Sequence, residues 1–142
     1  MDIIQKEITL SAKSRGFHLI TSEILSAIPE LSGFTSALAH IHIKHTSASL
    51  TLNENADPSV RRDFEVHFNR MVPEDASLFE HNYEGLDDMT SHLKSSILGH
   101  SLTIPVSRGA FNLGIWQGIY LCEHRNHARG RDIVITVTGN RG

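Results

Sequence analysis

The chain has 142 residues, of which 20% are charged, and a formal net charge of −3 at pH 7. This length suits one domain, because folding a chain of this size removes about 68–70% of its unfolded surface from water, and we expect residues 1–142 to form it. A slightly acidic chain is not expected to bind nucleic acid or an anionic membrane. No apolar run is long enough to cross a bilayer and no signal-peptide pattern is present, which predicts a cytoplasmic protein.

Histidine is the feature of the composition that points to chemistry. The chain has ten histidines against six phenylalanines. Histidine is the side chain best suited to metal binding and proton transfer near neutral pH. The single cysteine, Cys122, cannot form an intrachain disulfide, and its apolar neighbours predict a buried thiol rather than a nucleophile.

The first half of the chain predicts two strand regions separated by a short helix. Residues 3–13 alternate between apolar and polar types and are followed by the apolar segment 16–20, which predicts a hairpin that turns at residues 14–16. Thr21 is the expected N-cap of an amphipathic helix that ends at Pro29. Residues 34–55 are rich in β-formers, and we expect them to break near His45 into two strands.

Two further helices are predicted in the middle of the chain. Asp57 is the expected N-cap of the first, with Pro58 at its first helical position and an apolar stripe at Val60, Phe64, Phe68 and Met71. A polar loop follows over residues 73–86. The second helix is expected to begin at Asp87 or Asp88 and to end at the glycine C-cap Gly99.

The last third of the chain is β again, with expected strands in 101–107, 114–124 and 132–139. Within 114–124, Trp116 and Gln117 would lie on opposite faces of a strand, so that Trp116 packs in the core and Gln117 needs a polar partner. Runs of strands around three separated helices predict an α+β fold with a mainly antiparallel sheet.

Asp88 and His92 are the first candidates for a site. They lie four residues apart, so on a helix they share one face with Cβ atoms about 6 Å apart. His92 would sit at the edge of a buried stripe formed by Met89, Leu93 and Ile97, where an imidazole needs a partner. A structural hydrogen bond and a ligand role explain it equally well.

Other polar residues gather where the expected strands end, which is where sheet proteins tend to build sites. These residues are His45, Asn53, Glu54, Asp57 and His81, together with the segment 122–131. Each has a structural alternative: Asp57, Asp87 and Asp88 could serve only as helix caps. His40 and His42 alternate with isoleucines and would line one face of a strand, either solvated or bonded to a neighbour.

Four cations lie near these segments and would suit an anionic ligand, in particular a phosphate. They are Lys94, Arg108, Arg129 and Arg131. Solvated surface charge is the alternative for each of them.

Four blocks of the sequence, in this order, resemble the YjbQ family of small uncharacterised proteins. They are HTSASLTLNENADPSVRRDFE, DDMTSHLKSSILG, GAFNLGIWQGIYLCEH and RDIVITVTG, and the likeness runs from about residue 15 to the end. The resemblance implies an antiparallel sheet curled into a half barrel with flanking helices. It also implies a homotrimer with clefts between subunits and a secondary thiamine-phosphate synthase activity.

The resemblance further implies a polar site, and places Arg129 or Arg131 on its basic side. The matching histidine, acidic and amide positions are His45, Glu54, Asp57, His81, Asp88, His92, Gln117 and Glu123. Ala110 departs from the pattern, in which a basic or larger residue often stands there.

The implied reaction joins a pyrimidine-methyl pyrophosphate to a thiazole phosphate and releases pyrophosphate, so the site needs cations directed at the leaving group. We therefore expect a divalent metal, zinc or magnesium, at His45, Asp88 and His92, with Glu54 and His81 as further catalytic candidates. The ligand-binding candidates are Lys94, Arg108, Gln117, Arg129 and Arg131. Two alternatives stay open: a metal-dependent hydrolase of a phosphorylated metabolite, and a non-enzymatic trimeric module that binds a metal or anion.

Overall fold

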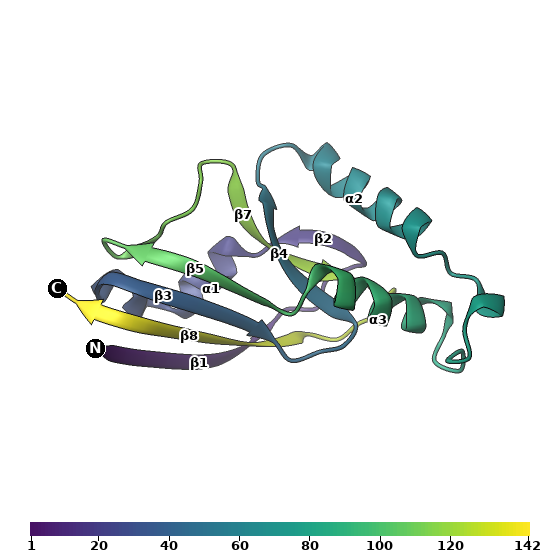
Figure 1. Ribbon diagram of the computed structural model, residues 1–142, viewed down its shortest axis with the longest axis horizontal. Helices are drawn as coiled ribbons and strands as arrows, with labels where there is room; N and C mark the ends of the chain where they lie inside the picture. The colour runs from purple at the N-terminus through teal and green to yellow at the C-terminus, as the bar shows by residue number, and fades with distance from the viewer.

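The computed structural model describes residues 1–142 and contains two antiparallel sheets and three α-helices (Figure 1). The larger sheet has five strands in the order β1-β8-β3-β5-β6, and the smaller has three in the order β2-β7-β4. The strands are β1 (Asp2–Leu10), β2 (Gly16–Leu19), β3 (Phe34–Ile43), β4 (Ala48–Glu54), β5 (Ser101–Ser107), β6 (Ala110–Phe111), β7 (Gln117–Glu123) and β8 (Arg131–Arg141). The α+β class with mainly antiparallel pairing is confirmed; the sheets do not close into a barrel and are compatible with a half-barrel curl.

The helices are α1 (Thr21–Ala27), α2 (Pro58–Met71) and α3 (Leu86–Leu98), with 3-10 turns at η1 (Pro29–Gly33) and η2 (Ala76–Leu78). In Figure 1, α2 and α3 lie at the end of the molecule away from both termini, and α3 runs beside β4. None of the helices combines the length and the apolar character needed to span a bilayer.

The core lies between the sheets, and the larger sheet contributes to it by alternation along its strands. On β3, Ala37, Ala39, Ile41 and Ile43 are buried while the residues between them face outward, and β8 alternates in the same way. Ile24 and Ile28 of the α1 region complete the main cluster. A smaller cluster forms where Phe17 of β2 packs against Phe64 and Phe68 of α2.

Several local predictions are confirmed. The chain between β3 and β4 breaks at residues 44–47, as expected near His45. Asp57 caps α2, because its carboxylate accepts a hydrogen bond from the Ser59 backbone N–H at 2.9 Å. Cys122 is fully buried, and burial raises the pKa of its thiol to about 12.

Three local predictions are wrong. Residues 14–16 do not close a hairpin, because β1 pairs with β8 in one sheet and β2 pairs with β7 in the other. Thr21 is not the N-cap of α1; its hydroxyl accepts a hydrogen bond from the Ile119 backbone N–H at 2.9 Å and so fastens the helix to β7. Trp116 is 62% exposed, because the chain turns between Gly114 and Gln117 and β7 begins only after it.

His124, directly after β7, is a fully buried imidazole in this core. Its Nε2 lies 2.8 Å from the Ser49 hydroxyl, and burial, together with the positive charge of Lys94 and Arg15, lowers its pKa to about 3. Between its folded and unfolded pKa values, this histidine is therefore protonated in the unfolded chain and neutral in the folded chain. The contribution of the neutral ring to the free energy of unfolding is complete above the pKa of His124 in the unfolded chain. It decreases as the pH falls toward the pKa of His124 in the folded chain.

We expect His124→Gln, which keeps a partner for Ser49, to flatten the pH dependence of the free energy of unfolding. The wild-type slope between about pH 6.5 and about pH 4 should exceed that of the variant by up to about 1.4 kcal/mol per pH unit. Urea unfolding at several pH values measures both slopes. His127→Gln, at an exposed position, is the matched control. Equal slopes for wild type and His124→Gln would contradict the assignment.

Candidate functional site

The buried face of α3 is polar. Its buried residues are Asp87, Asp88, Thr90, Ser91, Lys94 and Ser95, whereas Leu86 and Ile97 are each 55% exposed. The expectation of a buried apolar stripe is therefore wrong for Ile97, while Met89 and Leu93 are half-buried. The buried hydroxyls donate to backbone carbonyls. Ser95 donates to the carbonyl of Ala48 on β4 at 3.0 Å, whereas Thr90 and Ser91 donate within the helix, to Leu86 and Asp88.

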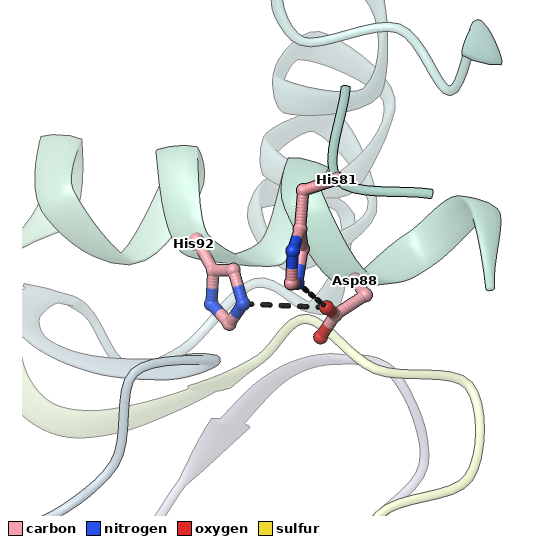
Figure 2. Close-up of side chains that lie close together, drawn as sticks. All are labelled: His81, Asp88 and His92. Carbon is pink, nitrogen blue, oxygen red and sulfur yellow. Dashed lines mark hydrogen bonds and ion pairs between the residues drawn. The ribbon is translucent and has the colours of Figure 1, made fainter. Parts of the chain in front are cut away.

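Three side chains converge at the beginning of α3 and form the His81–Asp88–His92 cluster (Figure 2). Asp88 and His92 come from the helix, and His81 reaches them from the loop that precedes it. His81 Nε2 donates to Asp88 Oδ2 at 2.7 Å, and His92 Nε2 lies 3.4 Å from the same oxygen. Asp88 is 1% exposed, so the cluster has a buried carboxylate at its base.

The tautomer of His92 follows from its second nitrogen. His92 Nδ1 lies 2.9 Å from the backbone carbonyl oxygen of Thr46, which can only accept a hydrogen bond, so Nδ1 carries a proton. In the neutral ring, Nε2 then presents a lone pair to the Asp88 carboxylate. That arrangement is unfavourable unless a proton or a cation lies between the two groups.

Arg125, in the turn between β7 and β8, fixes the base of the cluster. Its guanidinium bonds to Oδ1 of Asp88 and, through Nε at 3.1 Å, to Asp87. Asp87 also accepts from the Asn126 backbone N–H at 2.8 Å. Neither aspartate caps α3, whose N-cap is Gly85, so the capping alternative is wrong for both.

The protonation state of Asp88 is set by opposing effects. Burial raises its pKa, but the hydrogen bond from His81 and the charges of His92 and Arg125 outweigh burial and hold the pKa below its usual range. Asp88 is therefore a carboxylate with one oxygen engaged by Arg125 and the other turned toward two imidazoles.

A polar pocket of about 450 Å³ lies beside the cluster and shares His92 with it. Its lining residues are His45, Thr46, His92, Ser95, Ser96 and His100. The lining offers hydroxyl and imidazole groups and includes neither Lys nor Arg. A small polar molecule in this pocket would touch the cluster through His92.

His45 lines the pocket but is not part of the cluster. The Asp132 backbone N–H donates to its Nε2 at 2.8 Å, so this nitrogen is occupied as an acceptor. Burial and the neighbouring Arg131 lower the pKa of His45, which favours the neutral ring.

The comparisons with known proteins agree with one another. The family model described as "UPF0047 protein YjbQ-like" matches residues 6–140. The UPF0047 protein YjbQ of Escherichia coli O157:H7 is 55% identical over 135 residues, which is 95% of this chain and 97% of that protein. The chain belongs to the YjbQ/UPF0047 family. The expected membership is thus confirmed, and the descriptions of these relatives name no reaction.

Solved structures of the YjbQ family share the fold. An uncharacterised conserved YjbQ/UPF0047 family protein from Clostridium acetobutylicum is 32% identical with a TM-score of 0.78, covering 95% of this chain and 99% of that chain. A YbjQ-like protein of unknown function from Sulfolobus solfataricus P2 has a TM-score of 0.86 at 22% identity, covering 98% of this chain and 99% of that chain. At that identity the likeness supports the fold alone.

The remaining positions matched to the YjbQ pattern fall into separate places. Glu54 and Gln117 are register partners on β4 and β7, beside a depression of about 300 Å³ that they share with Leu52, Asn53 and Trp116. Glu54 accepts from the backbone N–H groups of Ala56 and Asp57, both at 3.0 Å. It stands at the opposite end of β4 from the cluster, about 20 Å along the strand from Ala48.

The four candidate cations are not gathered in the pocket. Arg131 is buried and forms two bonds to the carboxylate of Glu123, at 2.7 and 2.5 Å. Lys94 is also buried, donates to Asn69 at 2.7 Å and has its pKa lowered by burial. Arg108 and Arg129 are exposed, and Arg108 occupies the tip of the β5–β6 turn with a φ of 53°.

Arg125 and Thr46 are the contributors that sequence reasoning missed. Arg125 is 37 residues from Asp88, and Thr46 holds His92 through its backbone carbonyl rather than through its side chain. The only available signal for Arg125 was its place in the histidine-bearing segment 122–131, and a backbone carbonyl leaves no signal in the sequence.

Proposed function

We propose that the His81–Asp88–His92 cluster binds a divalent metal ion and that the chain is a metal-dependent enzyme acting on a small phosphorylated metabolite. The observation that supports this most is the set of three donor atoms, all within 4.8 Å of one another. Donors around a tetrahedral ion at bond lengths of about 2.0–2.1 Å are separated by about 3.3 Å. The 3.4 Å between His92 Nε2 and Asp88 Oδ2 matches this separation. The 2.7 Å between His81 Nε2 and Asp88 Oδ2 is that of a hydrogen bond, whose proton a bound ion would replace.

The chemistry of the donor set favours zinc over magnesium, since two imidazoles and one carboxylate suit zinc while magnesium takes mainly oxygen ligands. Three protein ligands leave a position open, which is the pattern of catalytic sites. The Thr46 carbonyl orients His92, and Arg125 holds the second oxygen of Asp88, as outer partners of metal ligands do.

A bound metal would supply Lewis-acid stabilisation of charge on a phosphoryl or pyrophosphoryl oxygen. The chain's own residues supply the rest. The pocket presents the hydroxyls of Thr46, Ser95 and Ser96 to a small polar substrate. His45 forms part of the pocket wall, with Nε2 engaged by the Asp132 backbone N–H and Nδ1 3.4 Å from Arg131.

Two reactions follow from this arrangement. The first is the thiamine-phosphate synthase-like transfer that the family resemblance implies, in which the cluster lies at the leaving pyrophosphate. The second is hydrolysis of a phosphorylated metabolite, and it is favoured by the lack of Lys and Arg in the pocket lining, because a pyrophosphate leaving group calls for several cations. Tight binding of metal and anion without turnover would indicate the non-enzymatic module instead.

The metal assignment predicts that His92→Ala and Asp88→Asn lose the zinc ion of the cluster, one ion per chain, while His127→Ala keeps it. The first two remove a ligand and the last an exposed imidazole elsewhere. Elemental analysis after dialysis against Zn²⁺ measures the metal, with circular dichroism as the check on folding. Wild-type protein without stoichiometric metal would refute the cluster as a metal site; so would folded His92→Ala that retains all of it.

The enzyme assignment predicts turnover that depends on the same residues. We expect zinc-loaded wild type to act on one member of a panel containing phosphate monoesters and a pyrimidine-methyl pyrophosphate with a thiazole phosphate. Asp88→Asn should lower kcat by at least about 100-fold, as losses of electrostatic stabilisation do. Glu54→Gln, at the far end of β4, is the comparison; activity lost only in Glu54→Gln would transfer the chemistry to the depression beside Trp116.

The family resemblance also leads us to propose a homotrimer in the cytoplasm. It is supported by apolar side chains left exposed at two places, the loop before β7 and the outward face of α3. They are Ile115 at 82%, Trp116 at 62%, Leu86 at 55% and Ile97 at 55%. Sedimentation equilibrium should give three times the mass of 15.8 kDa, with Trp116→Ser weakening association; a wild-type monomer would overturn the proposal.

A further inference from the structure

A second group of histidines lies on the outer face of the larger sheet. His40 and His42 stand two residues apart on β3, and the alternation that buries Ile41 and Ile43 turns both imidazoles outward. Their rings are nearly parallel, with an interplanar angle of 14° and centroids 6.4 Å apart. The ring of His100, which precedes β5, lies 5.6 Å from that of His42. These three residues form the His40–His42–His100 row.

The three rings of this row have no hydrogen-bond partner in the protein, and His100 also lines the polar pocket beside His92. The side-chain hydrogen bonds of the protein engage the rings of His18, His45, His81, His92 and His124, but none of them involves the ring of His40, His42 or His100. The neighbours of His40 across the sheet are Thr103 and Thr136, which neither neutralise nor repel a cation. Each ring therefore has a nitrogen available to an ion.

The backbone beneath the row is fixed, because β3 is paired on both sides, with β5 and with β8. Residues two apart on a strand place their Cβ atoms about 6.8 Å apart. Imidazoles bound to one ion through bonds of about 2.0–2.1 Å have ring centres about 4.5–5 Å apart. The ring centres of His40 and His42 would have to approach each other by about 1–2 Å, which rotation of the exposed side chains allows without moving the strand.

We propose that the His40–His42–His100 row is a second metal site, which binds a divalent transition ion of the imidazole-preferring class: Cu²⁺, Ni²⁺ or Zn²⁺. His40 and His42 supply a two-point chelate along one strand, and His100 adds a third nitrogen from the start of the neighbouring strand. Hard ions such as Mg²⁺ are excluded, since the row offers no oxygen ligand of its own. The proposal does not rest on the metal site proposed above, because it shares no ligand with the His81–Asp88–His92 cluster; His100 is common to the row and to the pocket beside that cluster.

The test is a Cu²⁺ titration of the full chain followed by electron paramagnetic resonance and isothermal calorimetry. The double variant His81→Ala/His92→Ala serves as the background, because it lacks the other cluster. Cu²⁺ bound by this background protein therefore reports on the row. In this background, adding His42→Ala should weaken Cu²⁺ binding by about tenfold or more and reduce the number of nitrogen couplings. His40→Ala should have the same direction of effect, because it removes the other half of the chelate.

His127→Ala in the same background is the matched control, since it removes an exposed imidazole outside the row. We expect it to leave the affinity and the spectrum unchanged. In wild type, saturation with Zn²⁺ should shift the imidazole NMR signals of His40 and His42 together. The proposal is overturned if the background protein binds no Cu²⁺. It is equally overturned if His42→Ala and His40→Ala bind Cu²⁺ with the affinity and spectrum of the background.

Discussion

The buried ion pair between Glu123 at the end of β7 and Arg131 at the start of β8 is the constraint on which the candidate site depends. It joins the smaller sheet to the larger one through two short bonds, in a place where an unpaired charge would be very costly. With both ends of the connecting turn fixed, the turn must project Arg125 toward α3. The Asp132 amide, next to Arg131, likewise determines where the His45 ring lies.

Arg125 then explains why α3 can bury charge. A helix whose inner face carries two aspartates and a lysine is unstable against an apolar sheet, because each charge loses its hydration. Here Arg125 bonds to one oxygen of each aspartate, and the Ser95 hydroxyl donates to the Ala48 carbonyl of β4. The helix therefore covers the end of the smaller sheet with polar groups, and two of its apolar residues, Leu86 and Ile97, are exposed. Because α3 turns polar side chains inward, it also supplies the pocket with hydroxyl groups.

The sequence predicted the elements better than their contacts. Capping at Asp57, the breaks near His45 and Gly99, and the α+β class follow from local rules, and all are confirmed. The pairing of β1 with β8 is set by contacts more than 120 residues apart, so no turn signal near residues 14–16 could reveal it. For the site, Asp88 and His92 were found from their i, i+4 spacing. His81 was proposed only from its position, and Arg125 was missed because its partner is distant in sequence.

The burial of Cys122 determines how the protein responds to oxidants and disulfides. Only the thiolate reacts readily with oxidants and disulfides, and a pKa of about 12 together with complete burial keeps that form and its access negligible in the folded state. The cysteine lies on β7, the strand at the centre of the smaller sheet. Oxidants and disulfides in the surroundings therefore do not modify the thiol of the folded chain. The Cys122 thiol becomes reactive only when the smaller sheet unfolds.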